Sequence, residues 1–274
     1  MAIRIFVISL SSLVLAACAA TPAPVAPESP AAINPRMDDF GHRWIQNAAE
    51  YQALSLQVYQ AATDALPGYI ADTSWSALPG QDNVADLPPA VILDVDETVV
   101  SNIEFQMYYQ SPFTNMKMHK FNDANAAIPV AGVAEFVASA RESGVTVFFV
   151  TNRPCEVVAG EADPCPQKRS TIEDLAEIGI ATDPEHVFLS DEQGWNREKS
   201  TRRYYVAQTY RVLMLFGDDL GDFLPCVRKK IYAPCTDAAS AASRQRLVDD
   251  HLEYWGRGWY VLPNPMHGSW TSAE

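Results

Sequence analysis

Two short acidic clusters are the residues of this sequence whose types and spacing most directly suggest chemistry. Residues 94–98 read Asp-Val-Asp-Glu-Thr, and residues 217–223 read Gly-Asp-Asp-Leu-Gly-Asp-Phe. In the first cluster, one carboxylate can act as a nucleophile while the other carries protons. In the second, hard carboxylate oxygens a few residues apart suit Mg²⁺, which keeps several waters and takes few protein ligands. Each cluster by itself is also compatible with a solvated acidic turn.

Two further polar groups could bind an anion. Thr151 and Asn152 follow an apolar run, where a hydroxyl, an amide and backbone N–H groups can bind phosphoryl oxygens. A helix cap is the simpler interpretation of that pair. Lys199 lies at the start of an expected helix and could reach an anion held nearby, although an ordinary surface lysine is the simpler interpretation. Neither group is specific when taken alone.

The elements expected around these residues belong to an α/β fold. Four short apolar runs, bounded by polar residues, are typical of buried parallel strands: residues 90–93, 145–150, 186–189 and 211–216. Helical patterns lie between these runs at residues 133–143, 168–178 and 199–209, and a long amphipathic helix is expected at residues 40–66. The alternation predicts a doubly wound parallel sheet, in which ligands bind beyond the carboxyl ends of the strands. Except for Lys199, the polar groups follow predicted strands, so one shared site is expected.

Taken together in chain order, the motifs D-x-D-x-T, T-N, K and G-D-D-x-x-D resemble the motif set of the haloacid dehalogenase (HAD) superfamily. Residues 44–54 resemble the N-terminal helix of the class C acid phosphatases, which are lipoprotein phosphatases and 5′-nucleotidases of the four-aspartate HAD group. Residues 262–270 resemble their C-terminal stretch. The resemblance implies a HAD-like doubly wound parallel sheet flanked by helices, with a small cap insert at about residues 99–130.

The resemblance also implies roles for the acidic residues. Asp94 would attack phosphorus and form an aspartyl-phosphate, and Asp96 would protonate the leaving alkoxide and later accept a proton from water. Mg²⁺ would be held by the carboxylates of Asp94 and Asp218 and by the main-chain carbonyl of Asp96, with Asp222 acting through water. Lys199 would neutralise the nucleophile and the transferring group. Positive charge would then lie where the transition state spreads negative charge.

The same resemblance implies a site for phosphomonoesters, with Thr151 and Asn152 binding phosphoryl oxygens. Class C relatives hold a base or nicotinamide ring between two aromatic side chains, and the matching positions here are Phe121 and His267. The family more often has Trp and Tyr there, so we expect a weaker nucleotide preference and broader use of simple phosphomonoesters. Alternatively, Phe121 belongs to the core of the cap and His267 is a turn residue.

We therefore expect a Mg²⁺-dependent acid phosphatase whose phosphomonoester substrates include nucleoside 5′-monophosphates. The alternative is a catalytically inactive nucleotide-binding surface lipoprotein, although an inactive copy should have lost Asp94, Asp96 or Lys199. Arg153 could steer phosphate or lie on the surface, and His119 is expected to be a packing or surface residue.

The charge balance bears on the partners. The chain has 20 Lys and Arg residues against 34 Asp and Glu residues, a formal net charge of −14. A surface this acidic argues against a nucleic-acid polymer or anionic lipid headgroups as partners, because phosphate backbones need cationic contacts. The expected partner is a small phosphomonoester or nucleotide, for which the site itself must supply positive charge.

The N-terminal residues have the pattern of an export signal rather than of a folded domain. Arg4 precedes an apolar run that is too short to span a membrane, so residues 1–17 are expected to be a signal peptide. The run ends in Leu-Ala-Ala-Cys, which looks like a bacterial lipobox with Cys18 as the lipidated residue; a chance cysteine at an ordinary cleavage site is the alternative. Ala19 indicates the outer membrane by the rules of that family. Residues 18–36, rich in Ala and Pro, are expected to form a tether, and residues 37–274 the phosphatase domain.

The remaining cysteines are expected to form disulfides. Cys155, Cys165, Cys226 and Cys235 are an even number in a chain with an export signal. Zinc is the alternative, but no C-x-x-C spacing is present. Local pairing of 155 with 165 and of 226 with 235 is favoured, while crossed pairing stays open because both loops leave the same edge of the predicted sheet.

Overall fold

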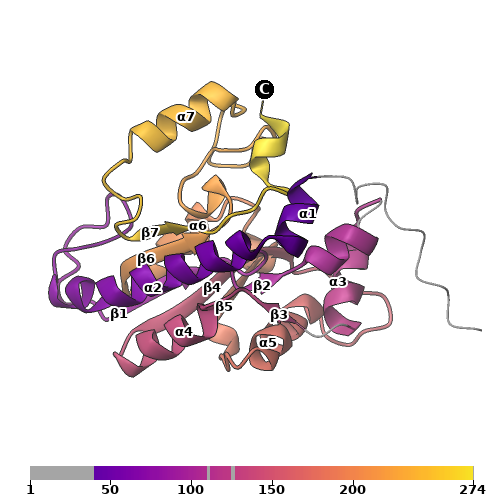
Figure 1. Cartoon of the computed structure of the whole chain (residues 1–274), viewed down its shortest axis with the longest axis horizontal. Coiled ribbons are helices and arrows are strands. Elements are labelled where there is room, and N and C mark those ends of the chain that lie inside the picture. Colours follow the sequence, from indigo (N-terminus) through magenta and orange to yellow (C-terminus); the bar gives the residue numbers. More distant parts are fainter. Residues whose placement is uncertain (1–39, 110–111, 125–126, 274) are drawn as a thin grey trace, which may run out of the picture.

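A five-stranded parallel sheet forms the centre of the protein (Figure 1). The computed structural model describes residues 40–109, 112–124 and 127–273. The strand order is β5-β4-β1-β6-β7, with β1 in the middle. These strands are β1 (Pro89–Leu93), β4 (Thr146–Pro154), β5 (Val187–Ser190), β6 (Arg211–Gly217) and β7 (Trp259–Val261). The predicted α/β fold with a doubly wound parallel sheet is confirmed.

Helices cover both faces of this sheet. The α-helices of the described residues are α1 (Phe40–Asn47), α2 (Ala49–Ala71), α3 (Asn115–Ala124), α4 (Val133–Glu142), α5 (Pro166–Glu177), α6 (Ser200–Val206) and α7 (Ala241–Asp249). Side chains alternate along a strand, so Val91 and Leu93 pack in a core cluster with residues of α2, α4 and α5. Ile92 packs in a second cluster, with Val206 of α6. Because both faces are buried, the strands have the continuous apolar sequences from which they were predicted.

The strands of the central sheet differ from the prediction mainly at two places. β4 extends to Pro154, so Thr151 and Asn152 lie within its last residues, where the pairing with β5 shifts between Val150 and Pro154. β7 was not predicted, although its Trp259 is 1% exposed and packs in the second core cluster. A strand of three residues carries no periodic signal, and β7 is defined by its parallel pairing with β6.

The single helix predicted at residues 40–66 is two helices in the structure. Ala48 has extended backbone angles, φ −81° and ψ 121°, and separates α1 from α2. α2 then continues through Pro67 to Ala71. An internal proline disfavours a helix by about 3 kcal/mol. Tertiary packing offsets this, because Leu66 is buried in the core cluster and Tyr69 and Ile70 pack against it.

A small insertion follows β1 and forms the cap. Its base is an antiparallel pair of β2 (Val100–Ser101) and β3 (Ile128–Pro129), with Val100 opposite Pro129. Between these strands lie the π-helical turn η2 (Phe105–Tyr109) and helix α3, which packs against α5 (Figure 1). The remaining short helical turns are η3 (Pro184–His186), η4 (Glu192–Gly194), η5 (Leu220–Asp222) and η6 (Ser269–Ser272). Because the insertion is anchored directly after β1, it stands next to the carboxyl end of that strand.

Two disulfides close short loops next to the carboxyl ends of β4 and β6. Cys155 pairs with Cys165, with Cα atoms 4.8 Å apart, and Cys226 pairs with Cys235, with Cα atoms 5.3 Å apart. The favoured local pairing is therefore present, and the crossed pairing is not.

The predicted signal peptide, Cys18 and the tether lie outside the residues that the structure describes. Within the described part of the chain, none of the helices combines the length and the apolar character that a membrane crossing requires.

Candidate active site

The polar groups found in the sequence gather at the carboxyl ends of the parallel strands, around a cavity of about 300 Å³. Asp94 follows β1, Asp218 follows β6, and Asn152 lies near the end of β4. The predicted site residues that line the cavity are Asp94, Asp96, Asn152, Lys199, Asp218, Asp222 and His267. Thr151 and Phe121 are not among the residues that line it.

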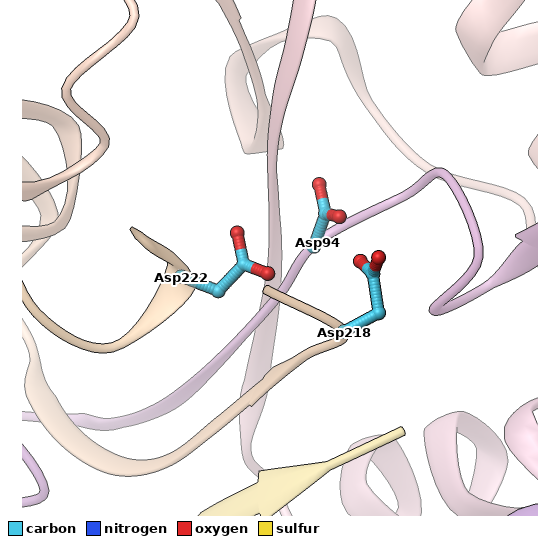
Figure 2. Close-up of side chains that lie close together, drawn as sticks. All are labelled: Asp94, Asp218 and Asp222. Atoms are coloured by element: carbon cyan, nitrogen blue, oxygen red, sulfur yellow. The ribbon is translucent and has the colours of Figure 1, made fainter. Parts of the chain in front are cut away.

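Three of the predicted carboxylates converge on one point. Asp94, Asp218 and Asp222 each offer a carboxylate oxygen, and these oxygens lie within 4.8 Å of one another (Figure 2). The approach of Asp222 depends on Gly217, since a Cβ atom there would lie 2.2 Å from the Cβ of Asp222. Three hard oxygen ligands at this spacing fit a divalent cation such as Mg²⁺.

The crowding of these carboxylates changes their acidity. Burial, and then the charge of Asp222, raise the pKa of Asp94 to about 7 although Lys199 opposes the shift. Burial, and then the charges of Asp222 and Asp94, raise the pKa of Asp218 well above its ordinary value. A bound cation would reverse both shifts, because it stabilises the ionised form.

Lys199 lies between two of the three carboxylates. Its Nζ donates to Asp94 Oδ1 and lies 2.6 Å from Asp222 Oδ1. Burial lowers the pKa of Lys199, but Asp222 and Asp94 outweigh it and the net shift is upward. Lys199 is therefore a buried cation held beside the predicted nucleophile, and not the surface lysine of the simpler interpretation.

Asp96 is held by a different partner. Arg153 donates from Nε and Nη2 to Asp96 Oδ1, at 3.0 and 2.9 Å, while its Nη1 donates to Asp174 at 2.5 Å. Burial raises the pKa of Asp96, but the charge of Arg153 outweighs burial and lowers it. Arg153 is 5% exposed, which excludes the surface alternative. Sequence reasoning missed this ion pair because its two members are 57 residues apart.

The strand-end residues Thr151 and Asn152 have different positions. Thr151 is fully buried, and its Oγ1 donates to Asp96 Oδ2 at 3.2 Å and accepts from the backbone N–H of Arg153. Asn152 lines the cavity, and its Oδ1 accepts a hydrogen bond from Arg202. The donor end of the Asn152 amide is therefore the part that can bind an oxyanion.

Helix α3 of the cap forms one wall of the cavity. Asn115, Met118, His119 and Asn122 line the cavity and follow the i, i+3, i+4, i+7 spacing of one helix face. Phe113, just before α3, also lines it and is 52% exposed. The ring of Phe121 instead packs near that of Phe105, with the two ring centroids 5.4 Å apart. This is the placement expected if Phe121 belongs to the cap core.

The C-terminal segment closes the cavity on another side. His267 Nε2 lies 2.9 Å from Glu97 Oε2. Burial lowers the pKa of His267, but Glu97 outweighs it and raises the pKa above its ordinary value. Asp219 accepts from the backbone N–H of Ser269 at 2.6 Å, and Asp218 accepts from Asn264 at 2.7 Å. These contacts hold His267 at the cavity, although Glu97, Asp219 and Asn264 were not predicted to do so.

Known proteins share this arrangement of elements. The sequence matches the family described as HAD superfamily, subfamily IIIB (Acid phosphatase), over residues 7–270. Among solved structures, the chain is similar to the class C acid phosphatase from Bacillus anthracis, with 26% sequence identity, a TM-score of 0.66 and 84% of each chain covered. A structure of the class C acid phosphatase from Bacillus anthracis with tungstate bound matches with the same identity of 26%, TM-score of 0.66 and coverage of 84% of each chain.

Proposed function

This chain belongs to the HAD subfamily IIIB acid phosphatases, which makes it a phosphomonoesterase, and from that premise we propose a Mg²⁺-dependent reaction through an aspartyl-phosphate on Asp94. The predicted resemblance to class C acid phosphatases is confirmed by the family match and by the similar structures. The observation that carries the mechanism is the position of Asp94, whose carboxylate contacts Lys199 and lies in one group with Asp218 and Asp222.

In the first step, an Asp94 carboxylate oxygen bonds to phosphorus while the bond from phosphorus to the leaving oxygen breaks. Asp96 takes up a proton when the anionic phosphoryl group binds beside it, and it gives that proton to the leaving oxygen. Lys199 stabilises the charge that spreads over the transferring group, because its ammonium lies beside Asp94 in a buried site. Asn152 would bind a phosphoryl oxygen from the wall of the cavity.

In the second step, water attacks phosphorus and gives a proton to Asp96. The bond between phosphorus and Asp94 breaks, and inorganic phosphate leaves. Arg153 prepares Asp96 for this step, since the ion pair favours the ionised form that accepts a proton. Tungstate, a tetrahedral oxyanion like phosphate, is bound in one of the similar structures, which supports an oxyanion-binding site here.

The metal site fits this chemistry. Asp94 and Asp218 would hold Mg²⁺ together with the main-chain carbonyl of Asp96, and Asp222 would act through water. When bound, the cation supplies positive charge to the nucleophile and to the phosphoryl oxygens. Mg²⁺ is favoured over softer metals because the available ligands are carboxylate and carbonyl oxygens.

We propose that nucleoside 5′-monophosphates are part of the substrate range, on the basis of the side chains that line the cavity. The wall formed by α3 offers amide groups at Asn115 and Asn122, and Phe113 offers an aromatic face. Amides can bind the edge of a base, and aromatic rings stack on its face. His267, at the side of the cavity, offers a second flat ring. Simple phosphomonoesters would use the phosphoryl part of the site alone.

We also propose that the enzyme is anchored to the outer membrane by a lipid on Cys18. The lipobox and the Ala- and Pro-rich tether of residues 18–36 support this proposal. The alternative of a catalytically inactive lipoprotein does not fit, since Asp94, Asp96 and Lys199 are all present at the cavity.

One experiment tests the proposed reaction. The purified domain is assayed on a panel of phosphomonoesters with Mg²⁺ and with EDTA, next to Asp94→Asn. We expect turnover that EDTA removes and Mg²⁺ restores, and we expect Asp94→Asn to lose at least about 10⁴-fold in rate with an unchanged circular dichroism spectrum. Near-normal turnover by a folded Asp94→Asn protein would contradict nucleophilic catalysis. Full activity in EDTA would contradict the metal requirement.

A further inference from the structure

Helix α6 carries two adjacent arginines that the proposed reaction does not use. Arg202 is 0% exposed and Arg203 is 2% exposed. Burial lowers the pKa of each to about 10, so both stay charged near neutral pH. Among the residues that the structure describes, both guanidinium groups donate to carbonyl and amide oxygens rather than to carboxylates, and neither Nε makes a hydrogen bond. Burying a charge without an ion-paired carboxylate is unfavourable, so the hydrogen bonds of each guanidinium must compensate for that cost.

Arg202 contacts the strand end that would bind the phosphoryl group. Its Nη1 donates to the main-chain carbonyl of Thr151, and its Nη2 donates to Asn152 Oδ1 at 2.6 Å. The same Nη2 lies 3.2 Å from the carbonyl of Asn196, in the loop before α6. These bonds fix the direction of the Asn152 amide, whose other end is available to an oxyanion.

Arg203 contacts the loop that would bind the metal. Its Nη1 donates to the carbonyl of Gly221 at 3.0 Å, and its Nη2 donates to the carbonyl of Phe223 at 2.9 Å. These two carbonyls flank Asp222, so one guanidinium holds the backbone on both sides of that carboxylate. The planar fork of arginine can span two oxygens in this way, whereas the single ammonium of lysine cannot.

We propose that Arg202 and Arg203 are positioning residues with separate tasks: Arg202 orients the phosphoryl-binding residue Asn152, and Arg203 orients the metal-binding residue Asp222. Lys199, which contacts Asp94 and Asp222, lies close to them in the sequence. The start of α6 therefore sets the distance between the phosphoryl-binding part of the site and its metal-binding part. This inference rests on the proposed function.

The test compares Arg202→Met and Arg203→Met with a matched control, Arg211→Met. Arg211 is another buried arginine that donates to main-chain carbonyls, those of Tyr69, Ile70 and Asp72, but it lies at the opposite end of β6. Two affinities are measured by calorimetry: that for Mg²⁺ without substrate, and that for inorganic phosphate at saturating Mg²⁺. Thermal unfolding is measured for every variant.

We expect Arg203→Met to weaken Mg²⁺ binding by about tenfold or more while changing the phosphate affinity little, since loss of a residue that orients a metal ligand has an effect of that size. Arg202→Met should do the reverse, weakening phosphate binding about tenfold with little effect on Mg²⁺. Arg211→Met should lower the thermal stability and leave both affinities unchanged.

The proposal of separate tasks would be overturned if each variant changed both affinities equally. It would also be overturned if neither variant changed either affinity. If a methionine variant does not fold, Arg202→Lys and Arg203→Lys replace it, because lysine keeps the charge but reaches only one of the two oxygens; the same opposite pattern is then expected, with smaller shifts. Wild-type turnover is measured alongside. An inactive wild-type protein would overturn the proposed function, whereas an active wild type with the wrong variant pattern overturns only this inference.

Discussion

At the scale of single residues, the environments of Asp94 and Asp96 shift the acidities of two identical side chains in opposite directions. Burial and neighbouring carboxylates raise the pKa of Asp94 to about 7, although Lys199 opposes them. Burial also acts on Asp96, but the adjacent Arg153 outweighs it and lowers the pKa. In the metal-free site these shifts run opposite to the two roles, because a nucleophile needs the ionised form and a general acid needs the protonated form. A bound cation lowers the pKa of Asp94, and a bound anionic phosphoryl group raises that of Asp96.

The proton-carrier role of Asp96 predicts a dependence on the leaving group. Asp96→Asn should lower kcat/KM for an alkyl phosphate by about 10²- to 10⁴-fold, because an alkoxide needs a proton as it leaves. An aryl phosphate with an acidic leaving group should lose much less. The Mg²⁺ affinity serves as a control, since the main-chain carbonyl is unchanged. Equal losses of kcat/KM for both substrates would contradict a general acid.

The raised pKa of Asp94 predicts a pH dependence of metal binding. In the metal-free protein the folded state holds this proton more tightly than the unfolded state does. The resulting stabilisation is complete below the ordinary aspartate pKa of about 3.9 and is lost as the pH rises through about 7. Mg²⁺ needs the ionised carboxylate, so protons compete with it below that pH. The increase in Tm on adding Mg²⁺ should therefore be larger above pH 7 than below it.

Differential scanning fluorimetry with and without Mg²⁺ on both sides of that pH measures this effect. Asp218→Asn is the matched control and should lose most of the increase at each pH. The same Tm increase at both pH values in the wild-type protein would argue against coupling between the Asp94 proton and the metal.

At the scale of elements, we expect the cap to decide which leaving groups the enzyme accepts. Phe113 lines the cavity from the start of α3, whereas Phe121 packs at 5.4 Å from Phe105. Stacking on a base is worth about 1–3 kcal/mol. We expect Phe113→Ala to raise KM several-fold for a nucleoside 5′-monophosphate and little for a small alkyl phosphate.

Phe121→Ala separates the two interpretations of that residue. If Phe121 stacks on the base, its variant should show the same substrate-selective rise in KM as Phe113→Ala. If it belongs to the cap core, both substrates should be affected to a similar extent and the Tm should fall. Steady-state kinetics with the two substrates distinguishes these results. If neither Phe113→Ala nor Phe121→Ala changed KM, the cap would have no role in base binding.

The loop closed by the Cys155–Cys165 disulfide supports the same helix. Asn115 Nδ2 donates to Glu156 at 2.9 Å, and His119 Nε2 lies 3.1 Å from Glu161; both acidic residues belong to this loop. Replacing both cysteines by serine should lower the free energy of unfolding by roughly 2–3 kcal/mol by the loop-entropy estimate. It should also raise KM for nucleotides, because the wall of the cavity loses its support. Chemical unfolding and kinetics measure the two effects, and an unchanged nucleotide KM would show that the loop does not hold the cap.

At the scale of the whole molecule, a protein of net charge −14 brings four cationic side chains to one cavity. Arg153, Arg197, Lys199 and Arg228 all line it. Six carboxylates line the same cavity, so these cations do not by themselves give it a net positive charge: Asp94, Asp96, Glu97, Asp218, Asp219 and Asp222. The divalent cation that we propose would supply the additional positive charge that an anionic substrate needs.

The lipobox predicts how the whole molecule is placed. In a bacterial host, the wild-type chain should incorporate labelled palmitate and sediment with the membranes, whereas Cys18→Ser should do neither, because serine has no thiol to receive the lipid. Phosphatase activity in the soluble fraction shows that the variant is folded. A wild-type chain that is soluble and unlabelled would contradict the anchor.

Much of this protein was determined by local sequence patterns. The strands were predictable because both faces of the sheet are buried, so each strand is a continuous apolar run. Asp94, Lys199 and Asp218 were found because each lies next to a predicted element and in a motif of fixed order. The disulfides were favoured as local pairs because each closes a short loop.

Only the tertiary structure decided which partners these residues have. Arg153 pairs with Asp96 across 57 residues, and Arg202 reaches Asn152 across 50. A sequence indicates no such pairing, since an arginine is usually exposed and nothing local marks it as buried. β7 and the contact of His267 with Glu97 likewise exist only because the folded chain places distant segments side by side. The physical reason is that hydrophobic periodicity is a local property, whereas the compensation of a buried charge depends on groups brought together by the completed fold.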